Sequence, residues 1–286
     1  MKKIEKIAHM DMHRLTAPMG QQGVGLVPTM GALHEGHLSL IQAAKQACQE
    51  VGVSIFVNPT QFSPGEDFER YPRPIEADLA KCEAEGVDWV FCPSVEEMYP
   101  TGCVTRVQVD RLGDVLCGQH RPGHFEGVAT VVAKLFNIVQ PAMAFFGQKD
   151  AQQVAIIRRM VRDLCSPVKI AVCPTIREAD GLAMSSRNVY LSSSERAQAT
   201  VLFESLSWAK SEIESGQKDV AGLTREMRNK VIAAGPCEID YIEIVDADEL
   251  TPKSNVEGRC LIALAVRIGK ARLIDNLVVD APRHGS

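Results

Sequence analysis

The chain has 286 residues, of which 45% are hydrophobic, and a formal net charge of −5. This length supplies a core for one large domain or two ordinary ones, and the mixed charges give no chain-wide basic surface for nucleic acid. No apolar run reaches the roughly 18 residues of a membrane span, and the N-terminal MKKIEKIAHMDMHRL lacks the apolar stretch of a signal peptide, so we expect a cytoplasmic protein with no membrane partner.

In the first part of the chain, short apolar runs alternate with segments of helical periodicity. The predicted elements are strand 24–29, helix 37–50, strand 52–59, helix 76–86, strand 87–93, helix 126–140, strand 142–147, helix 150–164 and strand 168–175. Strands rich in valine, isoleucine and phenylalanine that alternate with helices are typical of a parallel sheet covered on both faces. We therefore predict an α/β domain over residues 1–175, whose ligands bind beyond the carboxyl ends of the strands.

The pattern changes after about residue 175. Ser192 and Glu195 have the spacing of a capping box, and one long helix is predicted to follow them. Farther along, residues 239–250 and 259–279 have the apolar content of strands joined by turns. We predict a smaller α+β domain over residues 176–286.

Nine cysteines are scattered along the chain without a CxxC pair, at positions 48, 82, 92, 103, 117, 165, 173, 237 and 260. A zinc or redox site is one interpretation of so many thiols. Their odd number and apolar surroundings favour the other interpretation, which is small buried side chains in a reducing compartment.

The stretch GVGLVPTMGALHEGHLSLI (residues 23–41) places His34 and His37 between a predicted strand and a predicted helix. Backbone N–H groups and the helix dipole at such a turn favour anions, and residues three apart share a helix face. Both imidazoles are therefore candidates to donate hydrogen bonds to phosphate and to stabilise a phosphoryl transition state. A structural capping pair and a zinc site are the alternatives, although the spacing is not HExxH. The GxGxxG fingerprint of nicotinamide enzymes is absent.

A second cluster, FFGQKDAQQ (residues 145–153), also follows a predicted strand. Gly147 permits a close approach of the backbone to a ligand, and Lys149 offers a compact positive charge suited to phosphate. Asp150 is suited to capping the next helix or to binding a ribose or a metal. The alternative is a capped helix with a solvated lysine.

A third cluster, READGLAMSSRN (residues 177–188), lies at the predicted domain boundary. The hydroxyls of Ser185 and Ser186 and the forked guanidinium of Arg187 are suited to holding phosphate oxygens. Serine-rich turns are common, so an ordinary turn is the alternative.

Two polar segments interrupt apolar surroundings. In VNPTQFSPGEDFERYPR (57–73), Asn58 and Gln61 directly follow a strand, where amides recognise hydroxyls or a carboxylate on a small substrate. In GQHRPGHFEG (118–127), a glycine-rich loop carries Arg121 and His124. This loop is either a substrate lid or a long surface loop.

Taken together, the motifs resemble the pantothenate synthetase (pantoate–β-alanine ligase) family. The blocks that occur in the family's order and approximate spacing are VPTMGALHEGHLSLI, VNPTQFSPGEDFERYPR, RPGHFEGVATVV, FGQKDAQQ and DGLAMSSRN. A bare HxGH is shared with the wider nucleotidyltransferase superfamily, whereas the five blocks together are specific. The resemblance covers essentially the whole chain and is densest over residues 27–191.

The resemblance implies a Rossmann-like, doubly wound parallel sheet followed by a smaller domain that closes over ATP, usually in a homodimer. It also implies a reaction in two steps. The carboxylate of pantoate attacks the α-phosphate of ATP to give pantoyl adenylate and pyrophosphate, and the amine of β-alanine then displaces AMP. Such an enzyme positions reactants and stabilises phosphate charge, and it needs no covalent protein nucleophile.

The resemblance further assigns roles to individual residues. The implied catalytic residues are His37, the expected proton donor, with His34, Lys149 and Arg187 at the phosphates. The backbone of Ile176 is expected to touch adenine, and residues 184–187 stand where the superfamily has its lysine-bearing KMSKS loop. The expected contacts to pantoate and β-alanine are Gln61, Gln153 and Asn58. The full set expected to bind ATP is Pro28, Thr29, Met30, Gly31, Ala32, Leu33, His34, Glu35, Gly36, His37, Gly147, Gln148, Lys149, Asp150, Ile176, Met184, Ser185, Ser186 and Arg187.

Mg²⁺ is implied by the chemistry of ATP. Some relatives carry consecutive aspartates after YPR, one of them implicated in magnesium binding, whereas this chain reads PIEADLA there. Asp78, preceded by Ala77, is the candidate that remains as a protein ligand of the metal.

Three other functions compete with this interpretation. An enzyme that transfers the adenylyl group to another acceptor keeps that group in its product and does not need the NPTQF and AQQ amides. A tRNA-binding, synthetase-like protein needs an anticodon-reading extension and a basic surface, which the short C-terminal region and the negative charge disfavour. A catalytically dead nucleotide-binding module would more readily have lost His37, Lys149 or Arg187, and all three are present.

Overall fold

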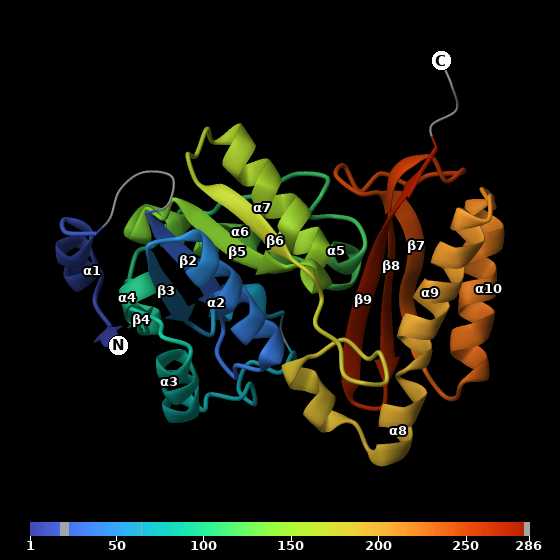
Figure 1. Cartoon of the computed structure of the whole chain (residues 1–286), viewed down its shortest axis with the longest axis horizontal. Helices are drawn as coiled ribbons and strands as arrows, with labels where there is room; N and C mark the ends of the chain where they lie inside the picture. The colour runs from blue at the N-terminus through green and yellow to red at the C-terminus, as the bar shows by residue number, and fades with distance from the viewer. Residues whose placement is uncertain (18–22, 64, 283–286) are drawn as a thin grey trace. The chain divides into compact units, whose positions relative to one another are not determined.

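The structure, a computed structural model, describes residues 1–17, 23–63 and 65–282. The chain divides into two compact units and passes between them more than once. Unit 1 comprises Met1–Asp114, Arg121–Gln148 and Ile156–Pro174, and unit 2 comprises Val115–His120, Lys149–Ala155 and the chain from Thr175 onward. Figure 1 colours both along the chain. Within the described residues, no helix has the length and apolar character needed to cross a membrane.

Unit 1 is built on a six-stranded sheet whose neighbouring strands all run parallel, in the order β1-β4-β3-β2-β5-β6. The strands are β1 Lys2–Ile4, β2 Val24–Thr29, β3 Glu50–Ile55, β4 Trp89–Phe91, β5 Met143–Gly147 and β6 Lys169–Cys173. From β2 the chain adds β3 and β4 on one side and then β5 and β6 on the other. Such a reversal is the switch point at which open α/β sheets bind ligands, and the predicted parallel sheet is confirmed.

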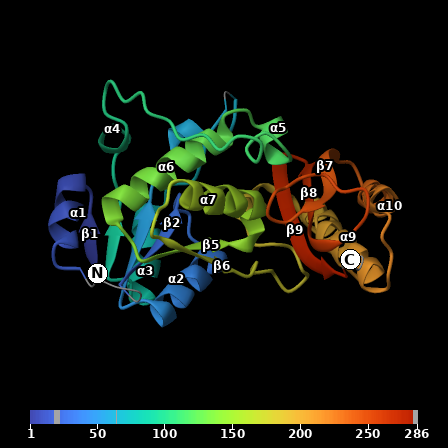
Figure 2. The same cartoon turned by 90° about the horizontal axis from the view of Figure 1, so that it is seen from above.

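Helices cover both faces of this sheet, as Figure 2 shows for α2 and α6. The helices of unit 1 are α1 Ile7–Arg14, α2 Glu35–Ala47, α3 Ile75–Ala84, α4 Val95–Met98, α6 His124–Val139 and α7 Ala151–Asp163, whose first turn belongs to unit 2. Helix α2 buries Leu40, Ile41 and Ala44 in a cluster with Val27 of β2 and Val53 of β3. This apolar face anchors α2 on the sheet, with its N-terminus just after the carboxyl end of β2.

The predicted strands and helices of this region all occur, with their ends shifted by a few residues. The helix predicted over 37–50 begins at Glu35 and ends at Ala47, because Cys48 has extended backbone angles (φ −124°, ψ 154°) and the chain then enters β3. Two elements near the N-terminus were not predicted. Strand β1 has only three residues, and α1 buries only Met10, so neither leaves a clear apolar pattern.

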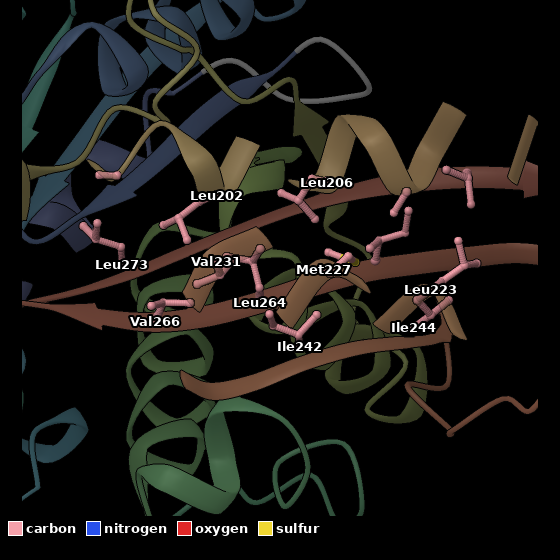
Figure 3. Packing of buried hydrophobic residues seen from close by; sticks show 14 of the residues in the cluster. Leu202, Leu206, Leu223, Met227, Val231, Ile242, Ile244, Leu264, Val266 and Leu273 are labelled. Carbon is pink, nitrogen blue, oxygen red and sulfur yellow. The ribbon is translucent and has the colours of Figure 1, made fainter. Parts of the chain in front are cut away.

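Unit 2 contains an antiparallel sheet in the order β7-β8-β9, with β7 Glu238–Asp246, β8 Gly258–Ile268 and β9 Ala271–Ala281. Its helices are α5 Cys117–His120, α8 Ser193–Gln198, α9 Val201–Glu214 and α10 Val220–Ala233. Helix α9 packs on β8 and β9, and α10 packs on β7. Figure 3 shows Leu206 and Met227 of these helices beside Ile242 and Leu264 of the strands. The α+β character predicted for this part of the chain is confirmed.

The capping box predicted at the start of α8 is also confirmed. The Oγ of Ser192 accepts a hydrogen bond from the N–H of Glu195 over 3.4 Å, and Oε2 of Glu195 accepts one from the N–H of Ser192 over 2.8 Å. The single long helix predicted after it is wrong, because α8 ends at Gln198 and α9 begins at Val201. Between them the hydroxyl of Thr200 donates to the carbonyl of Ala197 over 3.0 Å, a local bond that competes with regular helix geometry.

Candidate active site

The HEGH sequence forms the N-terminal cap of α2. His34 is the N-cap residue, with extended backbone angles (φ −134°, ψ 176°), and its Nδ1 accepts a hydrogen bond from the N–H of Gly36 over 3.1 Å. The Nδ1 of His37 accepts one from the N–H of His34 over 3.3 Å. The two rings lie with their centroids 4.1 Å apart. The alternative of a capping pair therefore describes the local structure correctly.

This cap also determines where the imidazole protons lie. A backbone N–H only donates, so the ring nitrogen that faces it must carry a lone pair. In the neutral form, the ring proton of His34 and that of His37 are therefore on Nε2. Each ring then presents an N–H donor at Nε2, which is what a contact to a phosphate oxygen requires. Capping the helix and donating to phosphate are compatible roles of the same two side chains.

The loop before the cap turns through two residues with left-handed backbone angles, Gly31 (φ 84°) and Ala32 (φ 50°). The N–H groups of Ala32 and Leu33 both donate to the carboxylate of Asp78, each over 2.8 Å. Consecutive N–H groups that converge on one point form an anion site. In this protein a carboxylate of the chain itself occupies that site, so two of the N–H groups expected to favour phosphate are already bonded.

Asp78 is 1% exposed, and each of its oxygens accepts a backbone hydrogen bond. Over residues 1–17, 23–63 and 65–282, no three His, Cys, Asp or Glu side chains are arranged to hold a metal ion. A magnesium ion bound by protein usually has one or two carboxylates together with waters and phosphates. The geometry of Asp78 does not fit a direct magnesium ligand, and its predicted metal role is not supported by this arrangement.

Gln61 ends the short 3-10 helix η1, Pro59–Gln61, and is 8% exposed. Its Oε1 accepts a hydrogen bond from Nδ2 of Asn58 over 3.1 Å, and its Nε2 lies 2.9 Å from the sulfur of Met30. A thioether is a weak acceptor, so the amide donors of Gln61 remain suited to a ligand oxygen. The amide is thus oriented with its donors toward Met30, a residue of the predicted ATP-binding stretch.

Asn58 was predicted as a substrate contact, but its hydrogen bonds are all made within the protein. Its side chain is 1% exposed, and its Nδ2 donates to the carbonyl of Gly127 over 3.1 Å as well as to Gln61. Its Oδ1 accepts from the N–H of Thr60 over 3.3 Å and from the hydroxyl of Tyr99 over 2.9 Å. Two backbone partners fix the orientation of Asn58, so the structure favours a role in orienting Gln61 over a contact with substrate.

Tyr99 is a member of this network that the sequence did not reveal. Burial raises the pKa of Tyr99, so its hydroxyl stays protonated at neutral pH and donates to Asn58. Gly127 of α6 is needed for the close approach of the same segments, because a Cβ there would lie 2.3 Å from the carbonyl oxygen of Thr60. The amide of Gln61, the predicted pantoate contact, is therefore held by groups from three parts of unit 1.

The segment 118–127, predicted as a glycine-rich loop that is either a lid or a surface loop, is mostly helical: α5 ends at His120, α6 begins at His124, and only residues 121–123 lie between them. Arg121 and His124 of this segment hold the backbone of Gln61. The guanidinium of Arg121 forms two hydrogen bonds with the carboxylate of Glu66, over 2.7 and 2.6 Å, and one with the carbonyl of Gln61 over 3.2 Å. Nδ1 of His124 donates to the same carbonyl over 2.7 Å, since a carbonyl only accepts. Burial alone would raise the pKa of Glu66, but the hydrogen bonds and charge of Arg121 outweigh it and lower that pKa. Arg121 and His124 thus fix the backbone carbonyl of Gln61.

Gly147 ends β5 and Lys149 follows in the 3-10 helix η2, Gln148–Asp150. A Cβ at Gly147 would meet no described atom within 4 Å, and its φ is not positive, so the local backbone does not itself require glycine. Such open space is what the predicted approach of a ligand to this backbone requires. In unit 2, Nδ2 of Asn276 on β9 donates to the carbonyl of Lys149 over 2.9 Å and positions the backbone of the predicted phosphate lysine.

The segment 177–188 folds as a hydrogen-bonded turn. Ser185 caps the 3-10 helix η3, Ser186–Tyr190, with its Oγ accepting from the N–H of Arg187 over 3.3 Å. The N–H of Met184 donates to the carbonyl of Ile176 over 3.0 Å. These bonds bring the predicted adenine contact and the predicted phosphate contacts of this segment into one compact turn.

Strand β9 anchors that turn as well. The guanidinium of Arg177 forms two hydrogen bonds with Asp275, over 2.6 and 2.9 Å, and lies 3.8 Å above the ring of Phe203. It also donates to the carbonyl of Gly181 over 3.1 Å. Asp275 is 3% exposed and Asn276 4%, in the otherwise apolar run LIDNLVV. That polar pair is the sequence signal that would have identified both supporting residues.

The predicted ATP and substrate residues therefore fall into two sets, each within its own unit. Unit 1 contains residues 28–37, Asn58, Gln61, Gly147 and Gln148, and unit 2 contains Lys149, Asp150, Gln153, Ile176 and residues 184–187. Gln153 is half-buried on α7, whereas its neighbour Gln152 is buried and bonded to the N–H of Cys117 and the carbonyl of Val115. Of these two glutamines, the one predicted to hold pantoate is the more exposed.

All nine cysteines are free thiols, and four of them are buried. Burial raises the pKa of Cys82 to about 12 and that of Cys92 to about 11. Both therefore remain protonated and poorly nucleophilic at neutral pH. Their environment agrees with a packing role.

Comparisons with known proteins identify the family of this chain. The family described as pantoate-beta-alanine ligase matches residues 2–278. Pantothenate synthetase of Caldicellulosiruptor bescii is 56% identical over 273 residues, covering 95% of this chain and 97% of the relative. That of Heliobacterium modesticaldum is 54% identical over 280 residues, covering 98% and 100%.

Solved structures give the same result. The crystal structure of pantothenate synthetase from Thermus thermophilus has a TM-score of 0.91 at 47% identity and covers 97% of this chain and 99% of that one. Pantoate-beta-alanine ligase from Francisella tularensis, complexed with beta-gamma ATP and beta-alanine, has a TM-score of 0.81 at 38% identity, with 97% of both chains covered. This chain belongs to the pantoate-β-alanine ligase family.

Proposed function

We propose that this protein is a pantoate–β-alanine ligase, which condenses (R)-pantoate with β-alanine through a pantoyl adenylate and releases AMP and pyrophosphate. Family membership over nearly the whole chain supports this activity. The structural observation that carries it is the histidine cap of α2, in which Nδ1 of His34 and Nδ1 of His37 each accept a backbone N–H group after the carboxyl end of β2.

In the first step, a carboxylate oxygen of pantoate attacks the α-phosphorus of ATP. The bond from that phosphorus to the bridging oxygen breaks, and pyrophosphate leaves with the electron pair. The Nε2–H groups of His34 and His37 donate to phosphate oxygens as negative charge develops, with His37 as the proton donor. Lys149 and Arg187 supply positive charge, and the Ser185 and Ser186 hydroxyls add hydrogen bonds.

The pantoate is held by amide groups. The donors of Gln61 are oriented by Asn58 toward an acceptor, which suits the carboxylate or hydroxyl oxygens of pantoate. Gln153 supplies a second amide. The role of these residues is to keep the attacking oxygen in line with the phosphorus, and such positioning lowers the barrier without any covalent bond to protein.

In the second step, the uncharged amine of β-alanine attacks the acyl carbon of the adenylate. The bond between that carbon and the AMP oxygen breaks, AMP leaves, and the nitrogen loses a proton as the amide forms. The thiols of Cys82, which is buried, and Cys92, which is half-buried, take no part, since neither is a thiolate at neutral pH.

Several finer features belong to the same proposal. ATP enters as its Mg²⁺ complex, and the metal supplies neutralisation of phosphate charge. Nucleotide and pantoate binding is assigned to residues 1–175 and closure over ATP to residues 176–286. The protein acts as a homodimer in the cytoplasm, where its nine free thiols suit a reducing compartment.

The test is pyrophosphate release from ATP and Mg²⁺, first with pantoate alone and then with β-alanine added. We expect release that depends on pantoate, and AMP with pantothenate only after β-alanine is present. A protein that binds ATP but stays silent with pantoate would instead transfer the adenylyl group to another acid or acceptor.

A further inference from the structure

Two side chains of α3 hold the backbone of the loop that leads into the histidine cap. Asp78 and Lys81 lie three residues apart, on one face of the helix. The carboxylate of Asp78 accepts the N–H groups of Ala32 and Leu33, and the ammonium of Lys81 donates to the carbonyl of Leu33. The two peptide groups that flank Leu33 are thereby fixed by opposite charges from a single helix.

The fit between this loop and Asp78 is tight. A Cβ at Gly31 would lie 3.0 Å from Oδ2 of Asp78 and 3.1 Å from a methyl carbon of Ile55, so a larger residue would push the loop away from α3. At its start the loop is held by Thr29, whose Oγ1 accepts the N–H of Gly31 over 3.2 Å and donates to the carbonyl of Ser54 over 2.8 Å. The loop is thus bonded at both ends and in its middle.

We propose that Asp78 and Lys81 are positioning residues, which clamp the loop 31–33 so that His34 and His37 meet the nucleotide in the correct place. The proposal rests on the proposed function, and it replaces a metal role for Asp78. The clamp lies next to the N-cap residue, so a shift of the loop moves the first imidazole directly. Displacement of a reacting group by about 1 Å costs on the order of 100-fold in rate.

A clamp and a metal ligand have different consequences when the charge is removed. In a clamp, the loss of one oxygen acceptor frees a backbone N–H and slows the reaction at every magnesium concentration. If Asp78 is instead a metal ligand, the same loss lowers the affinity for magnesium, and excess magnesium restores the rate. Asp78→Asn is suited to separate them, because it keeps the size of the side chain and replaces one acceptor oxygen by an NH₂ group.

The first measurement needs no substrate. Amide hydrogen exchange of the full-length protein is measured by NMR for the wild type, Asp78→Asn, Lys81→Met and the control Glu83→Gln, whose carboxylate is exposed on the same helix. We expect the N–H of Ala32 or Leu33 to exchange about 10- to 100-fold faster in Asp78→Asn, as expected for one lost hydrogen bond to a charged group. Unchanged exchange at both positions would overturn the clamp.

The second measurement is the single-turnover rate of pantoate-dependent pyrophosphate release, at a temperature where each variant is folded by thermal melting. For Asp78→Asn we expect a rate about 10- to 100-fold lower, with an unchanged half-saturating Mg²⁺ concentration. Recovery at high Mg²⁺ would assign Asp78 to the metal. A normal rate combined with faster exchange would reduce the clamp to a role in folding alone.

Two controls keep these outcomes apart. Lys81→Met reports on the same loop from its carbonyl side, so the proposal is tested even if Asp78→Asn does not fold; a normal rate in Lys81→Met would then overturn it. If the proposed function itself fails, the wild type releases no pyrophosphate with pantoate while Ala32 and Leu33 stay protected. A failed clamp shows a different pattern, with an active wild type and with amides of Ala32 and Leu33 that exchange at the same rate in Asp78→Asn as in the wild type.

Discussion

The backbone N–H of His34 donates to Nδ1 of His37 over 3.3 Å, so the side chain of the second histidine of HEGH holds the backbone of the first. His34 in turn accepts from the N–H of Gly36. Because each ring uses Nδ1 for this cap, neither ring can turn to offer Nδ1 to a ligand without breaking a bond at the start of α2. The orientation of both donors is therefore built into the helix terminus.

Replacing either histidine by asparagine separates its two roles. An asparagine oxygen can accept the same backbone hydrogen bond in either variant, and asparagine is a favoured residue at the N-cap position of His34, so the melting temperatures of His34→Asn and His37→Asn are expected to stay near that of the wild type. The Nε2 donor is lost, and adenylate formation is expected to fall by about 10²- to 10³-fold. Single-turnover pyrophosphate release measures this. A variant that keeps most of its rate would show that the histidine only caps the helix.

Gln61→Ala removes the oriented amide. We expect the affinity for pantoate to fall by about 10- to 100-fold, the range for a lost hydrogen bond to a charged group, while ATP binding stays close to normal. Calorimetry with each ligand separately checks both expectations. An equal loss of both affinities would point to a collapsed segment rather than a lost contact. Tyr99→Phe, which removes only the hydroxyl bond to Asn58, is expected to give a smaller loss in the same direction.

The ion pair of Glu66 with Arg121 predicts a dependence on pH. Glutamate in an unfolded chain titrates near pH ~4.3, and the folded-state pKa of Glu66 is lower. The stabilisation is therefore complete above the unfolded value and is lost as the pH falls through the folded value. We expect Glu66→Gln to lower the unfolding free energy by about 1.5–3 kcal/mol at pH 7 and by nothing once the pH is below the folded pKa.

Denaturant unfolding from pH 3 to pH 8 measures this difference. Glu69→Gln, which changes an exposed carboxylate of the same segment, serves as the control and is expected to follow the wild type throughout. A difference between wild type and Glu66→Gln that persists unchanged at the acidic end would contradict the ion pair as its cause.

Gly147→Ala tests the approach of a ligand to β5. The added methyl group meets no described atom within 4 Å, so the melting temperature is expected to stay within a few degrees of that of the wild type. ATP affinity is expected to fall, because the methyl group occupies the space that a nucleotide in contact with this backbone needs. Unchanged ATP affinity would remove Gly147 from the site.

Lys149→Ala is expected to lower adenylate formation by about 10²- to 10³-fold without unfolding the protein. Lys270→Ala, at the exposed turn between β8 and β9, is the control for loss of a positive charge. Asn276→Ala frees the carbonyl of Lys149 and is expected to give an intermediate rate with the side-chain charge still present. Near-normal turnover of Lys149→Ala would refute its role at the phosphates.

The sheet of unit 1 was predictable because each of its longer strands is a continuous apolar run, and because the helices between them are long enough to show periodicity. Helix α10 was missed although its signal was present. Leu223, Met227 and Val231 recur every fourth residue and are buried, and Asp219 caps the helix by accepting from the N–H of Ala221 over 3.1 Å. That spacing by itself predicts a helix over this segment.

The parts of the site that escaped prediction are long-range pairs. Asp78 meets its loop across 45 and 46 positions, Glu66 meets Arg121 across 55, and Asp275 meets Arg177 across 98. Local patterns such as HEGH and NPTQF identified the groups that we predict to face a ligand. They did not identify the partners of the carboxylates that support those groups, because the local sequence around a single acidic residue does not show which distant group it will bond.

The fixed orientation of Asn58 has a consequence for which acids this enzyme accepts. With Nδ2 of Asn58 on its oxygen, Gln61 offers only N–H groups on its other side. In a pantoate analogue with an ammonium group in place of the recognised oxygen, the N–H donors of that group would face the N–H donors of Gln61. The hydrogen bond from Asn58 prevents the Gln61 amide from rotating to offer its oxygen instead. If Gln61 holds pantoate as proposed, we expect amino analogues of pantoate to be rejected even where they match pantoate in size.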